Sequence, residues 1–222
     1  MNIDTYELLR SFRKNINSQN GEDGILEELM KRLNIHSGYV CEFGAWDGIH
    51  LSNTFNLIQK GFKSVLIEGD PEKFKDLEKL VEQYPTITPI CAWVDHVQDS
   101  PNLLDKLLQR TDIPIDFDVL SIDIDSFDYQ VWESLQVYRP KIVIIEINSV
   151  IPFSDLNHIH TPGVYEGSGS GPTFNLAKKK GYRFLTWTGN MIFIREDLYP
   201  QLESEYSLKL SLTGNGFKKS II

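Results

Sequence analysis

Two hydrophobic patterns alternate along most of this chain. In the first, apolar residues return every three or four positions, as Ile25, Leu29 and Leu33 do within residues 18–34, and this spacing is typical of an α-helix with one buried face. In the second, short runs are apolar without interruption, which is typical of strands buried on both faces. The pattern predicts helices near 18–34, 53–60, 71–84, 101–110, 131–135 and 174–180, and strands near 39–43, 64–67, 88–94, 118–124 and 141–147.

The last two predicted strands break this alternation. Residues 182–187 and 190–195 are separated only by Thr188 and Gly189, which is the spacing of a β-hairpin. Strands that alternate with helices form a parallel sheet covered on both faces, and the hairpin adds an antiparallel strand to it. We therefore expect a Rossmann-like α/β fold, with a mostly parallel seven-stranded sheet, a C-terminal antiparallel hairpin and helices on both faces. One domain is expected over residues 1–222, with an N-terminal helical segment at 1–36.

The charge balance narrows the class of partner. The 222 residues include 22 Lys and Arg against 31 Asp and Glu, a net charge of −9. Nucleic acids and anionic membranes favour positive surfaces, so we expect neither as a partner. No apolar run approaches the roughly 20 residues of a membrane-spanning helix, and we find no signal peptide. Cys41 and Cys91 lie in apolar segments and are expected to be buried and reduced. These features predict a cytoplasmic protein.

Glycines and acids follow the first two predicted strands, where open α/β sheets bind their ligands. The run EFGAWDG from Glu42 to Gly48 permits a close backbone approach, but it is no G-x-G-x-x-G dinucleotide motif, and Glu42 would repel a pyrophosphate. Glu68 ends the second strand, where an acid can accept both hydroxyls of a ribose. One adenosine-containing ligand explains both features, with Trp93 stacked on its adenine. The ligand-free alternatives are a tight turn, a helix-capping carboxylate and a core tryptophan.

Oxygen-bearing side chains end the next two strands. Asp123 and Asp125 are two residues apart, as are Glu146 and Asn148, so in a strand each pair points to the same side. Carboxylates that converge repel one another unless a cation or a shared proton lies between them. Oxygen donors suit Mg²⁺ or Mn²⁺, and we predict a metal site formed by all four residues. Solvated caps and loop turns are the alternative.

A long segment at residues 150–172 precedes the last predicted helix. Its Gly/Ser run at 167–171 is typical of a mobile loop, so we expect a lid that closes over a substrate, with this run as its hinge. His158 and His160 lie in this segment, and without further Cys or His they are expected to face a substrate rather than zinc. His36, His50 and His96 are expected at the surface.

Several of these motifs, in this order, resemble the FkbM-like methyltransferases. They are S-Q-N-G-E-D at 18–23, E-F-G-A-W-D-G at 42–48, L-S-N-T at 51–54, I-E-G-D-P at 67–71, S-I-D-I-D-S-F-D-Y-Q-V-W at 121–132 and R-P-K-I-V-I-I-E-I-N-S at 139–149. The resemblance covers roughly residues 18–200. Members are class I enzymes that use S-adenosylmethionine (SAM) and often O-methylate sugars and secondary metabolites.

The resemblance implies roles for particular residues. Glu42, Gly44, Asp47 and Asn53 would lie near the methionine part of SAM, and Glu68 would hold the ribose. The two aspartates after strand four resemble the acidic site of metal-dependent sugar O-methyltransferases. Those enzymes usually place two neighbouring acids after strand five, where this chain has Glu146 and Asn148, separated by one residue. The cofactor contacts expected in all are Gln19, Glu42, Gly44, Asp47, Gly48, Asn53, Glu68, Gly69, Asp70, Ala92, Trp93 and Asp123.

The expected activity is transfer of a methyl group from SAM to a hydroxyl of a sugar, a surface-glycan precursor or a secondary metabolite. Asp125 and Asp123 are the candidate catalytic residues, because a hydroxyl needs a base or a cation to become a good nucleophile. The partners expected are a small-molecule or sugar acceptor and a second copy of the chain in a homodimer. Two alternatives stay open: an NAD-type oxidoreductase, and a non-catalytic binding protein with the SAM fold.

Overall fold

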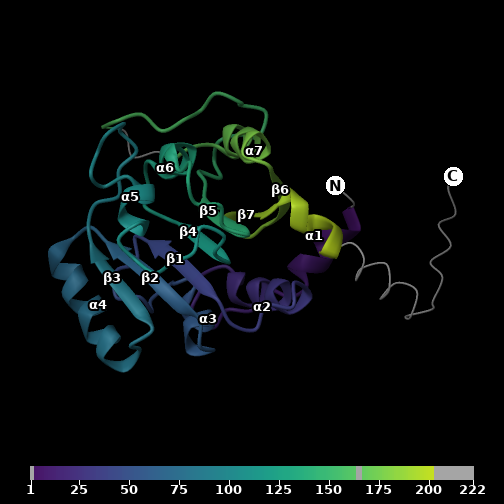
Figure 1. The fold of residues 1–222 in the computed structure, drawn as a ribbon. Coiled ribbons are helices and arrows are strands. Elements are labelled where there is room, and N and C mark those ends of the chain that lie inside the picture. Colours follow the sequence, from purple (N-terminus) through teal and green to yellow (C-terminus); the bar gives the residue numbers. More distant parts are fainter. Residues whose placement is uncertain (1–2, 164–166, 203–222) are drawn as a thin grey trace, which may run out of the picture.

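Seven strands form one sheet through the middle of the protein, in the order β3-β2-β1-β4-β5-β7-β6 (Figure 1). The computed structural model describes residues 3–163 and 167–202. The strands are β1 (Tyr39–Phe43), β2 (Lys63–Glu68), β3 (Ile87–Cys91), β4 (Val119–Ile122), β5 (Ile142–Glu146), β6 (Tyr182–Trp187) and β7 (Asn190–Arg195). Strands β1 to β5 pair in parallel, whereas β7 runs antiparallel to both β5 and β6. The predicted mixed sheet with its C-terminal hairpin is confirmed.

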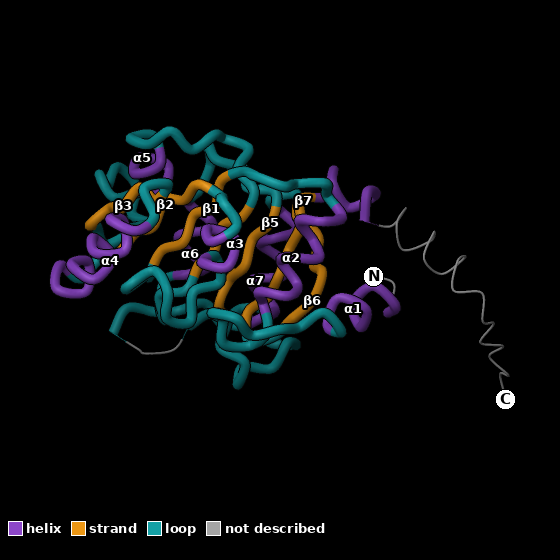
Figure 2. Tube along the Cα trace, turned by 90° about the horizontal axis from the view of Figure 1, so that it is seen from below, coloured by secondary structure: helices purple, strands orange, loops and turns teal. Residues whose placement is uncertain are grey.

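Helices cover both faces of this sheet (Figure 2). They are α1 (Ile3–Arg10), α2 (Glu22–Arg32), α3 (Phe55–Gln59), α4 (Pro71–Gln83), α5 (Leu104–Leu108), α6 (Asp128–Ser134) and α7 (Ser170–Lys179), and a short 3₁₀ turn, η1 (Glu196–Leu198), follows β7. Side chains of α1 to α4 form one buried apolar cluster, and side chains of α5 to α7 form another. Strand residues alternate between the two clusters, so Val40 belongs to the first and Cys41 to the second. This double burial explains the uninterrupted apolar runs.

Several boundaries differ from those predicted, mainly at the carboxyl ends of strands. β4 ends at Ile122 and β3 at Cys91, so the polar residues that follow lie in turns. The predicted hinge at 167–171 is also wrong in part, because α7 begins at Ser170. Gly169 donates its backbone N–H to the carbonyl of His158, and its Cα packs against Ile151. Tertiary contacts therefore hold a Gly/Ser run that by composition alone is typical of a mobile loop. The remaining lid residues 164–166 lie outside the described part of the chain.

The two cysteines differ in their surroundings. Cys41 is buried in the sheet, as predicted, but Cys91 is exposed at the end of the edge strand β3. The prediction for Cys91 is wrong because an edge strand has only one neighbour to cover it. No helix among residues 3–163 and 167–202 is both long enough and apolar enough to cross a membrane.

Candidate active site

The first turn after β1 requires glycine at two positions. Gly44 has a φ of +75°, and a Cβ at this position would overlap the backbone oxygen of Asp123 after β4. Gly48 has a φ of +77°, and a Cβ there would press on Leu80 of α4. Only glycine avoids both the steric clash and the unfavourable backbone conformation. The ends of β1 and β4 can therefore approach each other closely at the carboxyl edge of the sheet.

Glu42, at the end of β1, is buried and holds the loop that leads into α3. Its carboxylate accepts hydrogen bonds from the hydroxyls of Ser52 and Thr54, each at 2.6 Å, and from the backbone N–H of Asn53 at 3.0 Å. Burial raises the pKa of Glu42, and these hydrogen bonds act in the opposite direction. Asn53 in turn donates from Nδ2 to the hydroxyl of Ser121 on β4. Both predicted cofactor residues thus have partners within the protein.

Glu68, at the end of β2, accepts two backbone N–H groups. One comes from Trp46 at 2.7 Å and the other from Asp70 at 2.8 Å, one on each carboxylate oxygen. Trp46 is held at a φ of +45°, which is uncommon for a residue with a side chain. The nearby Asp47 accepts the backbone N–H groups of residues 49 and 50, and so closes the turn. Glu68 therefore aligns the turn after β1 with the end of β2.

A cavity of about 350 Å³ opens beside Glu68, and we call it the Trp93 cavity. Trp93 is 68% exposed and lies over Gly69, where a Cβ would overlap the indole. The core-tryptophan alternative is therefore wrong. The helix-capping alternative also fails for Glu68, because Asp70 is the residue that caps α4. The lining residues are Gly44, Ile67, Glu68, Gly69, Ala92, Trp93, Val94, Asp95, His96, Ile124, Ser126 and Phe127.

Two residues do not lie where the sequence predicted them. His96 was expected as an isolated surface residue, but its ring stacks on Phe127 at 4.6 Å between centroids and lines the cavity. The ring contact joins two loops that are far apart in the sequence, so no local pattern indicated it. Gln19 is exposed, and within the described part of the chain it belongs to neither this cavity nor the one beside the acids. Its neighbours Glu22 and Asp23 instead bind the loops around them.

Three acids meet where β4 and β5 end. Carboxylate oxygens of Asp123, Asp125 and Glu146 all lie within 4.8 Å of one another. The predicted mechanism of convergence, side-chain alternation along β4, is wrong, because β4 stops at Ile122 and Asp125 adopts a φ of +58°. A turn brings the acids together instead. The buried carboxylate of Asp128 holds this turn by accepting the backbone N–H groups of residues 124 and 126, each at 2.9 Å.

Burial and mutual repulsion change the ionisation of this acid cluster. Burial first, and the charge of Glu146 second, raise the pKa of Asp123 to about 8. Burial, together with Asp128 and Asp125, likewise raises the pKa of Glu146, although a hydrogen bond with Asp123 opposes the change. The pair therefore tends to share a proton near neutral pH when no cation is bound. A binding partner that carries positive charge would remove the repulsion.

A second cavity of about 480 Å³, the acidic cavity, adjoins these acids. Asn148 lines this cavity. Its backbone N–H donates to the carbonyl of Ser168, and its side-chain Oδ1 accepts the backbone N–H of Val150. Asp125 lines the acidic cavity, whereas its neighbours Ile124 and Ser126 line the Trp93 cavity. The turn at 123–126 thus separates the two cavities. The acidic cavity is lined by Asp125, Glu146, Ile147, Asn148, Ser149 and Gly167.

The described lid residues 150–163 are anchored at His160. This residue is buried, and its ring meets Phe127 edge-on at 4.6 Å. Its backbone N–H donates to the hydroxyl of Ser168, and its carbonyl accepts from Nε2 of Gln130. His160 is therefore a packing residue that attaches the lid to α6, whereas the sequence suggested a side chain that faces a substrate. His158 is partly buried nearby.

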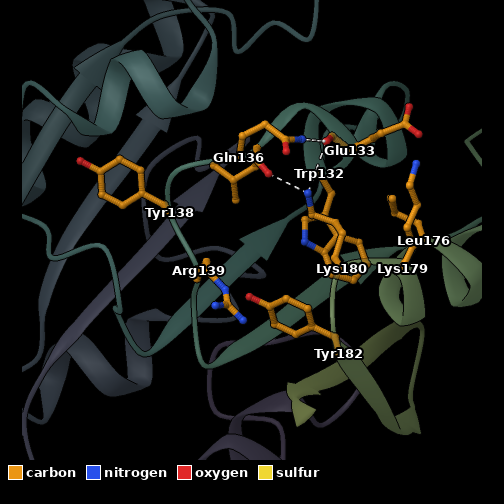
Figure 3. Close-up of a pocket in the computed structure, with 10 residues that line it drawn as sticks. Trp132, Glu133, Gln136, Tyr138, Arg139, Leu176, Lys179, Lys180 and Tyr182 are labelled. Carbon is orange, nitrogen blue, oxygen red and sulfur yellow. Dashed lines mark hydrogen bonds between the residues drawn. The ribbon is translucent and has the colours of Figure 1, made fainter. Parts of the chain in front are cut away.

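A third cavity, of about 290 Å³, lies between the ends of α6 and α7 at the opposite edge of the sheet (Figure 3). The Lys180 ammonium donates to the carbonyls of Glu133 and Leu135, drawn as dashed lines there. Burial lowers the pKa of Lys180. The lysine satisfies carbonyls that the end of α6 leaves without helical partners, and it ties α6 to α7. This cavity is remote from the acid cluster.

The fold of this chain is similar to that of solved methyltransferase structures. The sequence matches no protein-family model and no curated protein. A Staphylococcus aureus structure, provisionally assigned as a caffeoyl-CoA O-methyltransferase, aligns with a TM-score of 0.55 and 14% identity over 85% of this chain and 91% of its own. The CMeT domain of the citrinin polyketide synthase aligns with a TM-score of 0.51 and 13% identity over 79% of this chain and 51% of its own. The chain has a methyltransferase fold.

This methyltransferase fold accounts for the position of the site. Its parallel strands end at one edge, and both the Trp93 cavity and the acidic cavity lie there. At 13–14% identity the likeness concerns the fold alone.

Proposed function

We propose that this protein is a SAM-dependent O-methyltransferase of the FkbM-like type that methylates a hydroxyl of a sugar, a surface-glycan precursor or a secondary metabolite. The observation that carries the proposal is the turn at 123–126. It presents Asp125 to the acidic cavity, and Ile124 and Ser126 to the Trp93 cavity. A methyl donor in the Trp93 cavity and a hydroxyl in the acidic cavity would meet across this turn.

The Trp93 cavity suits the adenosine part of SAM. Each oxygen of Glu68 accepts one backbone N–H and retains capacity to accept a ribose hydroxyl. The exposed indole of Trp93 offers a flat surface for the adenine, and Gly44 allows close approach of the ligand to the backbone. When bound, SAM supplies an activated methyl group. The protein then has mainly to hold an acceptor oxygen in line with that group and to exclude water.

Asp125 is the residue that we assign as the general base, with Asp123 beside it. Asp125 is exposed in the acidic cavity, whereas Asp123 is more buried and interacts with Glu146. A hydroxyl is a weak nucleophile near neutral pH, and a carboxylate that accepts its proton during methyl transfer increases its reactivity. Asp128 positions this base by holding the turn on which it lies.

The donor set also fits a hard divalent cation. Asp123, Asp125 and Glu146 offer carboxylate oxygens close to one another, and Asn148 lines the same cavity. Oxygen-only ligands favour Mg²⁺ or Mn²⁺ over zinc. A cation held by these residues would lower the pKa of an acceptor hydroxyl and would offset the repulsion among the acids.

Substitution of Asp125 tests the proposal. We expect Asp125→Asn to lower the rate of S-adenosylhomocysteine release at least about a hundredfold, because general-base catalysis contributes that much or more. Binding of SAM, measured by calorimetry, should stay nearly unchanged. Asp112→Asn, at an exposed position away from both cavities, is the matched control. EDTA should inhibit, and Mg²⁺ or Mn²⁺ should restore activity.

The outcomes separate the proposal from its alternatives. Full turnover after exhaustive chelation would remove the cation and leave Asp125 as a simple base, and a fully active Asp125→Asn would mean that the site is misplaced. Thermal stabilisation by NAD but not by SAM would favour the oxidoreductase. Binding of SAM without turnover on any sugar or metabolite acceptor would favour a non-catalytic binding protein.

A further inference from the structure

Exposed apolar side chains are concentrated at one edge of the molecule. Among the described residues, thirteen large apolar side chains are exposed, and only Ile115 and Val137, in the loops before β4 and β5, lie at the amino edge of the sheet. The other eleven lie at the carboxyl edge, ten of them in loops and Trp187 at the end of β6: Ile16, Trp46, Ile49, Leu51, Trp93, Val97, Val150, Phe153, Leu156, Ile159 and Trp187. We call these eleven residues the apolar rim.

The apolar rim lies at the same edge of the sheet as the two cavities of the proposed site, and its member Trp93 lines one of them. Its members come from the loops after β1, β3 and β5 and from the end of β6, and the bridge between Ser18 and Leu51 brings Ile16 to the same edge. The lid alone contributes four members, of which Val150 is 85% exposed and Phe153 56% exposed. Scattered apolar residues are normal on protein surfaces, but their concentration around a candidate site indicates an apolar ligand or partner.

The charges around the acidic cavity exclude one kind of ligand. Its lining contains Asp125 and Glu146 and no Lys or Arg. The described lid residues 150–163 likewise contain Asp155 and no Lys or Arg. Even with a divalent cation bound, three ionised carboxylates leave a net negative charge. A phosphate or carboxylate on the acceptor would therefore be repelled in the acidic cavity.

We infer that the acceptor is an uncharged molecule with two parts: a hydroxyl-bearing polar part that enters the acidic cavity, and an apolar part that lies on the apolar rim. An alkyl or aryl glycoside has this chemistry, whereas a sugar phosphate or a nucleotide sugar does not. The inference rests on the proposed methyl transfer and specifies its substrate class. Asp125, Glu146 and Asn148 make the lining of the acidic cavity polar, which suits the hydroxyl-bearing part, so the apolar part is placed on the rim.

Matched acceptors test the inference directly. For one sugar at a time, the methyl glycoside, the octyl glycoside below its micelle concentration and the sugar 1-phosphate are incubated with the full chain, SAM and Mg²⁺. Release of S-adenosylhomocysteine then gives kcat/KM for each acceptor. We expect the octyl glycoside to exceed the methyl glycoside by tenfold or more, since burial of several methylene groups contributes about 0.8 kcal/mol each, and the phosphate to react most slowly.

Rim variants localise the effect. The double variant Val150→Ser, Leu156→Ser should reduce the ratio of kcat/KM for the octyl glycoside to kcat/KM for the methyl glycoside at least threefold. Ile115→Ser, at a residue that is 56% exposed at the opposite edge, should change neither rate and is the matched control. Because all three side chains are exposed, these variants are expected to fold, which thermal unfolding checks.

Other results would overturn the inference and can be told apart from failure of the proposed function. If the methyl glycoside or the sugar phosphate is turned over as fast as the octyl glycoside or faster, the inference about the acceptor is wrong, although methyl transfer itself stands. Cosedimentation with phosphatidylcholine vesicles that the rim variant loses would make the rim a membrane-binding surface, and conversion of a dimer to a monomer by that variant would make it a subunit interface. SAM binding without turnover of any acceptor would overturn the proposed function itself.

Discussion

At the scale of single residues, each strand end combines a structural role with a chemical one. Glu68 both fixes the turn around Trp46 and lines the Trp93 cavity. Gly44 is needed because a Cβ would overlap the backbone of Asp123, and Gly69 leaves the space in which the Trp93 indole lies. Glu42 differs, because its carboxylate is buried and already has three partners. Of the predicted cofactor residues after β1 and β2, Glu68 is therefore the best placed to contact a ligand directly.

Truncation of Glu68 should weaken SAM binding. We expect Glu68→Ala to lower the affinity by roughly tenfold or more, because charge-assisted hydrogen bonds to two hydroxyls are worth about 1.5–3 kcal/mol. Calorimetry with S-adenosylhomocysteine measures the effect, and Glu72→Ala, on the exposed surface of α4, is the control. Glu68 also holds backbone groups of Trp46 and Asp70, so the unfolding temperature must be followed in parallel. Unchanged affinity in a folded variant would mean that the ribose binds elsewhere.

At the scale of elements, the site depends on two segments without regular structure. The turn at 123–126 is held by Asp128 of α6, and the described lid residues 150–163 are attached at His160 to the same helix through Gln130. Phe127 contacts His96 on one side and His160 on the other. The loop after β3, the start of α6 and the lid therefore pack as one unit around Phe127.

Loss of the lid anchor should expose the lid to proteases. We expect chymotrypsin to cleave the native chain within 150–163, where Phe153 and Leu156 are exposed, and to cleave more slowly once SAM and an acceptor are bound. Gln130→Ala removes the hydrogen bond to the His160 carbonyl and should speed cleavage severalfold. The control is Gln136→Ala, just after the same helix. It removes an exposed hydrogen bond to the carbonyl of Glu133 and should leave the rate of cleavage unchanged. Equal cleavage with and without every acceptor tested would contradict closure of the lid.

At the scale of the whole molecule, buried acids make stability depend on pH. In the folded protein the pKa of Asp123 is raised from 3.8 to about 8. The native state therefore retains a proton that the unfolded chain has lost, and the free energy of unfolding falls as the pH rises from about 4 through about 8. The net charge of −9 adds general repulsion in the same direction. A bound cation would reverse this loss at the acid cluster.

The variant Asp123→Asn should remove much of this dependence. In the presence of a chelator, the free energy of unfolding of the native chain should fall between about pH 5 and about pH 8, and that of the variant should fall less. The difference between the two falls should be at least about 1 kcal/mol, since one unit of pKa corresponds to about 1.4 kcal/mol. Urea unfolding at several pH values measures the difference, with Asp112→Asn as the exposed control. Parallel pH profiles for Asp123→Asn and the native chain would show that the cluster does not hold the proton.

The sequence by itself determined the elements and their order. The mixed seven-stranded sheet follows from local patterns: continuous apolar runs for buried strands, a spacing of three to four for helices, and a two-residue gap for the hairpin between β6 and β7. It also indicated Glu68 and the acids Asp123, Asp125 and Glu146 as candidates, because ligands bind where parallel strands end. These inferences need only the periodicity of the chain and the general geometry of such sheets.

Only the tertiary structure decided how these residues are used. Asp123 and Asp125 meet Glu146 through a turn that buried Asp128 holds, not through strand alternation. The ring contacts of Phe127, the exposure of Trp93 and the gathering of exposed apolar side chains at one edge likewise depend on residues far apart in the sequence. The physical reason is that periodicity records which face of an element is buried. Burial, ionisation and contact in loops are set by whichever distant segments pack against them.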